Sequence, residues 1–143
     1  MRNIIYILVA TFLLCPLTAL SNEKINFSDP NTVEQLISGK TWDCKMIDAY
    51  GESTGELTFK TVKGNKVKGS IKVPHLPVCD SDRLKGKLKK NKLKYMAPNG
   101  TPCREVNGYL DFFTTDAGDI EATGTYGVGG THKRGSYVCH LRQ

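Results

Sequence analysis

The sequence predicts an all-β fold: an eight-stranded antiparallel up-and-down barrel with a short N-terminal helix and two disulfide bonds. Three observations lead to this prediction: eight β-rich runs with no helix between them, a repeated glycine motif, and an even number of cysteines after a leader-like N-terminus. The chain has 143 residues, 39% hydrophobic and 24% charged, which is enough for one core but short for two domains. This composition excludes a disordered tail, a coiled coil and a multi-span membrane protein.

Residues 1–21 have the layout of a secretory signal peptide. A short basic start precedes the apolar run at 4–14, and Ala19 and Ser21 supply the small residues that a signal peptidase requires. A retained membrane anchor is the alternative, but this run is shorter than the ~20 residues of a membrane span. Cys15 does not follow a small residue, which argues against lipidation. We therefore expect a secreted or periplasmic protein, cleaved after Ser21, with residues 22–143 as a single domain.

One short helix is expected at residues 31–38, because capping residues and Pro30 precede it and Gly39 follows it. After it, β-rich or alternating runs predict strands at 41–50, 55–62, 66–73, 84–89, 92–97, 108–115, 119–126 and 135–142. No helical crossover separates these runs, so successive strands should pair antiparallel. A meander of eight strands can remove its exposed edges by closing into a barrel.

A motif of glycine followed by apolar residues at every second position recurs six times. It begins at Gly55, Gly69, Gly86, Gly108, Gly124 and Gly135. Because side chains alternate between the two faces of a strand, the glycines and the apolar residues share one face. Inward glycines let strands bend around a tight barrel. A flattened sandwich could show the same pattern.

The connections between the predicted strands fall into two sets. Tight turns at 63–65, 90–91 and 116–118 alternate with connections at 51–54, 74–83, 98–107 and 127–134 that are mostly longer. In an up-and-down order each set lies at one end of the barrel. We expect a cup with a floor closed by the helix and a mouth of loops, which carries His75, His132, Lys133 and Arg134.

Residues 22–143 contain four cysteines, which in an exported chain indicate two disulfides. Cys44 and Cys139 lie in the first and last strands and become neighbours only if the sheet closes. Cys79 and Cys103 lie in two long loops at the same end. We predict the pairs Cys44–Cys139 and Cys79–Cys103. No spacing gives the close Cys-x-x-Cys pair of zinc sites, so we predict no metal, and we expect no cofactor.

This layout resembles the calycins, the lipocalin and avidin-like barrels. The GKTW sequence at 39–42 is similar to the glycine-then-tryptophan start of the first lipocalin strand, with one residue more. The TD sequence at 115–116 lies at the turn where lipocalins carry Thr-Asp-Tyr, with Ala117 in place of the tyrosine. The resemblance implies that Arg142 stacks on Trp42 and that the barrel is a ligand-binding cup. It does not identify a ligand, because function belongs to sites rather than folds.

The segment 83–95, RLKGKLKKNKLKY, is unusually rich in lysine. With its turn at 90–91, and with the preceding strand beside it, it predicts a basic outer wall, the lysine face, formed by Lys66, Lys68, Lys72, Lys85, Lys87, Lys89, Lys92 and Lys94. Such a face suits an acidic glycan, lipopolysaccharide, phospholipid headgroups or an acidic protein. The alternative is a solvated face that prevents aggregation. Aromatic residues for base stacking are missing from this face, which argues against nucleic acid.

Six aromatic residues are expected to face the interior: Trp42, Phe59, Tyr95, Phe112, Tyr126 and Tyr137. They line either a cavity for a small, partly polar ligand or a filled core. Catalysis has little support, because the chain has no HExxH, nucleophile-elbow or P-loop motif. The mouth histidines His75 and His132 could meet Asp80 or Asp82 as an acid/base pair, or be ordinary loop residues.

These observations favour a non-enzymatic exported barrel that binds a small ligand or an anionic surface through its mouth loops and its lysine face. A second hypothesis is a secreted or periplasmic inhibitor or interaction protein, whose disulfide-linked loops block a partner enzyme. A third is a hydrolase or isomerase with its site at the mouth. The sequence does not indicate the number of subunits.

Overall fold

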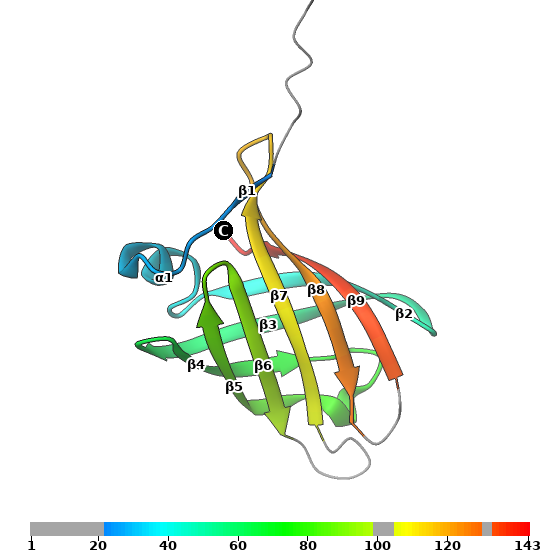
Figure 1. The fold of residues 1–143 in the computed structure, drawn as a ribbon. Helices are drawn as coiled ribbons and strands as arrows, with labels where there is room; N and C mark the ends of the chain where they lie inside the picture. Colours follow the sequence, from blue (N-terminus) through cyan, green and yellow to red (C-terminus); the bar gives the residue numbers. More distant parts are fainter. Residues whose placement is uncertain (1–21, 99–104, 130–132) are drawn as a thin grey trace, which may run out of the picture.

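The computed structural model of the protein describes residues 22–98, 105–129 and 133–143 (Figure 1). The predicted signal peptide, residues 1–21, lies outside them. The described elements are β1 (Glu23–Lys24), α1 (Pro30–Leu36), β2 (Thr41–Asp48), β3 (Gly51–Lys63), β4 (Lys66–Lys72), η1 (Pro77–Cys79), β5 (Ser81–Lys89), β6 (Lys92–Pro98), β7 (Glu105–Thr114), β8 (Ile120–Val128) and β9 (Lys133–Leu141). Among these residues, no helix has the length and hydrophobicity that a bilayer crossing requires.

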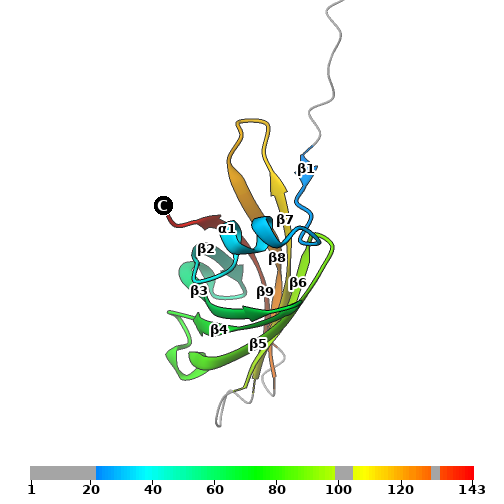
Figure 2. The same ribbon diagram turned by 90° about the vertical axis from the view of Figure 1, so that its left-hand side faces the viewer.

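Strands β2 to β9 form a closed antiparallel barrel in which each strand pairs with the next along the chain (Figures 1 and 2). The pairing of β9 with β2 closes the sheet. This confirms the predicted eight-stranded up-and-down barrel with one short helix, and it is consistent with a calycin-like fold at a coarse level. The two-residue strand β1 was not predicted, and it extends the sheet by pairing Glu23 with Thr114 and Lys24 with Phe113 of β7.

Helix α1 begins where the sequence supplies a cap and a proline. The Asp29 carboxylate accepts a hydrogen bond from the Asn31 amide at 3.0 Å, and Pro30 occupies the first turn. The helix ends one turn before Gly39, which has a left-handed φ of 67°. The Leu36 carbonyl accepts a hydrogen bond from the Trp42 indole at 2.9 Å, so the helix is held against the core near the tight-turn end.

Four strands begin two to four residues before their predicted positions: β3 at residue 51, β5 at 81, β7 at 105 and β9 at 133. Residues 51–54 are not a mouth loop but the first part of β3, and the β2–β3 hairpin turns tightly at residues 49–50. Glycine and polar residues at 51–54 indicated a loop, but pairing with the end of β2 makes them a strand. Lys133 and Arg134 likewise belong to β9 and not to a mouth loop, because they pair with Val128 and Gly127 of β8.

The seam of the barrel carries the predicted Cys44–Cys139 disulfide. The two cysteines lie directly opposite each other on β2 and β9, 95 positions apart in the sequence. In the chain-entropy model a bridge closing so long a loop contributes about 4.7 kcal/mol. Cys79 is buried and disulfide-bonded. Its predicted partner Cys103 lies outside the described residues, so the Cys79–Cys103 pairing stays a prediction.

The repeated glycines face the interior, and aromatic rings or backbone lie against them. A Cβ on Gly108 would come within 2.6 Å of the Thr125 carbonyl oxygen and 2.9 Å of the Tyr95 hydroxyl. A Cβ on Gly135 would come within 2.7 Å of the Tyr126 ring. The glycines therefore make room for tyrosines on neighbouring strands.

Candidate functional site

The lysine face lies on the outside of β4, β5 and β6, and all eight of its side chains are exposed. Cross-strand register places most of these lysines directly opposite one another. The opposed pairs are Lys66–Lys87, Lys68–Lys85, Lys87–Lys94 and Lys89–Lys92. Like charges in opposed positions destabilise a sheet, so this arrangement works against folding unless an anion neutralises it.

Two members of the lysine face have acidic partners. The Lys72 ammonium lies 3.8 Å from Glu56, and that of Lys92 lies 3.2 Å from Asp111. Among the described residues, no ion pair involves the other six, which are Lys66, Lys68, Lys85, Lys87, Lys89 and Lys94. Two ammonium groups ~5 Å apart repel by about 0.8 kcal/mol in water. The face therefore keeps an uncompensated positive potential.

The sequence prediction missed Lys63. It lies at the end of β3, exposed and directly opposite Lys66 across the tight turn at 64–65. Four lysines therefore follow one another across four adjacent strands, Lys63, Lys66, Lys87 and Lys94. The predicted turn at 63–65 was the signal that could have revealed this position.

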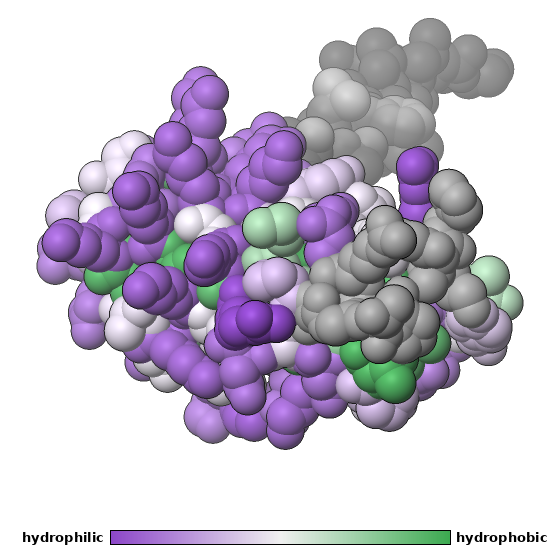
Figure 3. All heavy atoms as spheres, turned by 90° about the horizontal axis from the view of Figure 1, so that it is seen from below, coloured by the Kyte–Doolittle hydropathy of each residue, from purple (hydrophilic) through white to green (hydrophobic). Residues whose placement is uncertain are grey.

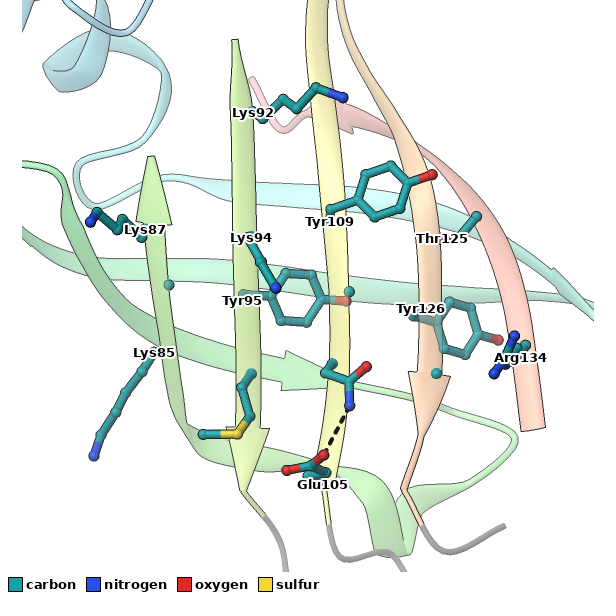
Figure 4. Close-up of a pocket in the computed structure, with 15 residues that line it drawn as sticks. Lys85, Lys87, Lys92, Lys94, Tyr95, Glu105, Tyr109, Thr125, Tyr126 and Arg134 are labelled. Atoms are coloured by element: carbon teal, nitrogen blue, oxygen red, sulfur yellow. Dashed lines mark hydrogen bonds between the residues drawn. The ribbon is translucent and has the colours of Figure 1, made fainter. Parts of the chain in front are cut away.

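Beside the lysine face the outer surface is hollowed into a groove of about 1010 Å³, the outer groove (Figure 4). Lys85 and Lys87 of β5 line it, together with Lys94 of β6 and Tyr109 of β7. Tyr109 is 43% exposed and lies directly opposite Lys94. The expectation that this surface lacks aromatic residues was therefore incomplete, because a tyrosine on the next strand adjoins it.

Arg134 lines the outer groove from β9, on the far side from the lysine face (Figure 4). It is exposed and lies opposite Gly127, so the main chain of β8 is open to the groove beside it. Glu105 also lines the groove, where its carboxylate accepts a hydrogen bond from the Asn107 side chain at 3.0 Å. The groove thus carries cations at both sides and one carboxylate at its end. The predicted mouth residue His132 lies outside the described residues.

A second cluster of polar side chains lies at the mouth end, whose surface is mainly hydrophilic (Figure 3). His75, in the β4–β5 connection, has its Nδ1 2.8 Å from the Ser53 hydroxyl and its Nε2 2.5 Å from Asp48 Oδ2. The Asp48 side chain is only 6% exposed and also accepts a hydrogen bond from the Tyr126 hydroxyl at 2.8 Å. Burial, followed by this hydrogen bond, raises the pKa of Tyr126 above its usual range.

The expected partners of His75 were wrong. The Asp80 carboxylate accepts a hydrogen bond from the Val73 amide at 2.6 Å, and Asp82 pairs with Lys60 at 3.3 Å. An imidazole between a hydroxyl and a carboxylate has the atom types of a general-base relay. Neither Ser53 nor His75, however, lines the outer groove. Instead, the hydrogen bonds and the close contact of this cluster link β2, β3, β8 and the β4–β5 connection.

The six predicted interior aromatic residues are all buried, each no more than 3% exposed. Their rings pack on one another: Trp42 meets Phe112 edge-on at 5.0 Å, and Tyr126 lies 5.6 Å from Tyr137. The Tyr137 hydroxyl is hydrogen-bonded to that of Tyr95 at 3.0 Å. Burial raises the pKa of Tyr95 and Tyr137 well above the usual tyrosine value.

Arg142 does not stack on Trp42, contrary to what the calycin resemblance implied. Its guanidinium lies outside the barrel, where it pairs with Asp43 and, at 3.0 Å, with Glu56. The hydrogen bonds from Arg142 hold the pKa of Asp43 below its usual value. Trp42 is fully buried and donates its indole hydrogen bond to Leu36 instead.

In the part of the chain that the structure describes, no group of three or more His, Cys, Asp or Glu side chains could hold a metal ion. No protein-family model matches the sequence, and no curated protein matches it. The lysine face and the outer groove beside it therefore define the candidate site by their own chemistry, as an exposed cationic surface next to a groove.

Proposed function

We propose that this chain is an exported, non-enzymatic binding protein of the lipocalin or avidin-like type, which holds an anionic partner against its lysine face. The observation that carries this proposal is the direct opposition of lysines across β4, β5 and β6, six of them outside any ion pair among the described residues. Such a surface costs stability in the free protein, and an anion would remove that cost.

The packing of the barrel interior favours the lysine face, rather than the interior, as the binding site. Tyrosine side chains lie against the inward Gly108 and Gly135, and the hydroxyls of Tyr95 and Tyr137 are hydrogen-bonded to each other. These contacts use the volume and the polar groups that a small ligand would otherwise need. The proposal therefore assigns binding to the outer surface.

Export rests on two observations. The Cys44–Cys139 disulfide fits a protein of an oxidising compartment, because such bridges persist outside the cytoplasm. Residues 1–21 have the predicted layout of a signal peptide. N-terminal sequencing of the protein recovered from culture medium or periplasm tests this, with Asn22 expected as the first residue.

Charge reversal on the lysine face tests the binding proposal. We expect the mature protein to be retained on heparin-agarose and on phosphatidylglycerol vesicles, and to be released by salt. The variant Lys66→Glu/Lys87→Glu should bind heparin about tenfold more weakly. The control Lys24→Glu/Lys45→Glu changes the net charge equally, on exposed lysines outside the face, and should bind nearly as tightly, although it also breaks the ion pair of Lys45 with Glu52. Equal losses in both variants would show that only net charge matters and would overturn the proposal.

An interaction protein that acts through its loops is the second candidate. Ile47 and Val78, which are 46% and 58% exposed, place large apolar side chains near the mouth end. Exposed apolar groups of this kind are typical of protein contacts. A single purified enzyme inhibited equally at low and high salt, with inhibition lost in Ile47→Asp or Val78→Asp, would favour this candidate over the lysine face.

A further inference from the structure

The lysines of the face are arranged in rows that run across the strands. One row is Lys63, Lys66, Lys87 and Lys94, each directly opposite the next on β3, β4, β5 and β6. Adjacent strands lie ~4.8 Å apart, so this row spreads its attachment points over about 14 Å. Repeated positive charge at a constant spacing complements a linear polymer that carries repeated negative charge.

The row of lysines leads to an exposed aromatic ring. Lys94 lies directly opposite Tyr109 on β7, whose side chain is 43% exposed and lines the outer groove. The Lys92 ammonium lies 5.7 Å from the centre of this ring. Figure 4 shows Tyr109 on the outer side of β7, with the lysines of β5 and β6 on one side and Arg134 on the other. A polymer lying along the row would therefore pass from cations onto a flat apolar surface.

Four anionic partners can be compared with this geometry. A flat bilayer would contact the exposed lysines without filling the outer groove of about 1010 Å³, and a single phosphate would use only two or three of the aligned lysines. A nucleic acid strand stacks successive bases on several aromatic side chains. On this part of the described surface, Tyr109 is the only exposed aromatic side chain beside the lysines. An acidic glycan needs lysines for its carboxylates or sulfates and one aromatic face for the C–H groups of a sugar ring.

We infer that the outer groove and the lysine row bind a linear acidic glycan that lies across strands β3 to β7. Its carboxylate or sulfate groups face Lys63, Lys66, Lys87 and Lys94, and one sugar ring rests on Tyr109. This inference rests on the proposed function, because it specifies the partner of the same surface.

The test compares ligands of similar charge and different shape. Binding of heparin disaccharide and octasaccharide, linear polyphosphate, oligothymidylate and phosphatidylglycerol vesicles is measured by calorimetry or by vesicle sedimentation at physiological salt. We expect the octasaccharide to bind most tightly and the disaccharide far more weakly. Lys63→Gln, at the far end of the row, should weaken the octasaccharide about threefold and leave the disaccharide nearly unchanged. Lys24→Gln is the matched control, and it should change neither.

Variants at Tyr109 separate contact with a sugar ring from attraction of charge. Tyr109→Ala should weaken the octasaccharide about fivefold, Tyr109→Phe should not weaken it, and neither should change polyphosphate binding. Equal effects of Tyr109→Ala on both ligands, or tighter binding of oligothymidylate or vesicles than of octasaccharide, would overturn the glycan inference and leave the proposed function in place. If no polyanion binds the wild-type protein, both fail.

Discussion

Asp48 at the end of β2 accepts a hydrogen bond from the Tyr126 hydroxyl of β8 at 2.8 Å, although 78 positions separate the two residues. The same carboxylate oxygen lies 2.5 Å from Nε2 of His75. A single, almost fully buried carboxylate therefore links two strands and the β4–β5 connection at the mouth end of the barrel.

This relationship predicts that Asp48 is important for stability. Asp48→Ala leaves the Tyr126 hydroxyl and the His75 ring without their common partner, so we expect a loss of about 2–3 kcal/mol in the free energy of unfolding. Ser53→Ala removes only the hydrogen bond on the other side of His75 and should cost under about 1 kcal/mol. Urea unfolding followed by fluorescence measures both. Equal losses in the two variants would contradict the central position of Asp48.

The sequence predicted the barrel well because several of its patterns indicated the same fold. The glycine motif placed six strands in one inward register, and the positions of Cys44 and Cys139 indicated closure at the seam. It could not predict β1, whose two residues form a strand only because the edge of β7 is present. Boundaries failed at 51–54 for the same reason, since pairing with β2 overrides the local preference for a loop.

The candidate site was predictable where it depended on one hairpin. The predicted turn at 90–91 sets the register of the hairpin, and in the structure Lys87 lies directly opposite Lys94. The outer groove depends on β5 to β9 together, so neither Tyr109 nor Arg134 could be assigned to it from local patterns. The sequence did not reveal Asp48 as the partner of His75, because the two residues meet only when the β4–β5 connection folds back over the end of β2.

The buried tyrosines predict unfolding at alkaline pH. The pKa values of Tyr95, Tyr126 and Tyr137 are raised in the folded protein, mainly by burial, while an unfolded tyrosine ionises near pH 10. Their contribution is therefore complete below about pH 10 and is lost as the pH rises toward the folded-state pKa values. Stability should fall by up to about 1.4 kcal/mol per pH unit for each tyrosine that stays protonated in the fold.

Urea midpoints at pH 8, 10 and 11 measure this loss. Lysine deprotonation changes the repulsion on the lysine face over the same range, so the comparison with Tyr137→Phe is essential. That variant keeps every lysine and should lose stability less steeply with pH. A pH dependence identical to that of the wild-type protein would show that Tyr137 ionises equally in the folded and unfolded states.

The close approach of strands at Gly124 predicts that a methyl group there is not tolerated. A Cβ would overlap the Tyr109 carbonyl, which belongs to the backbone of the paired strand and cannot move aside. Gly124→Ala should therefore cost about 2–3 kcal/mol. Gly129→Ala is the matched control, because its Cβ would first meet the flexible Glu105 side chain at 2.8 Å. An equally large loss of stability in Gly129→Ala would show that overlap with the backbone of the paired strand does not explain the cost of Gly124→Ala.

The final prediction concerns the energetic cost of the lysine face in the free protein. Lys87 lies between Lys66 and Lys94, so it experiences repulsion from both sides, and no ion pair among the described residues offsets it. Lys87→Gln should therefore increase the free energy of unfolding by about 0.5–1 kcal/mol at low salt, because it relieves two opposed pairs at once. The gain should shrink at high salt, where the Debye length is only about 3 Å at 1 M. Lys24→Gln, outside the face, should change stability little at either salt concentration. A Lys87→Gln variant that is less stable than the wild-type protein at low salt would mean that the Lys87 side chain stabilises the fold through packing. The lysine face would then carry no energetic cost for an anion to remove.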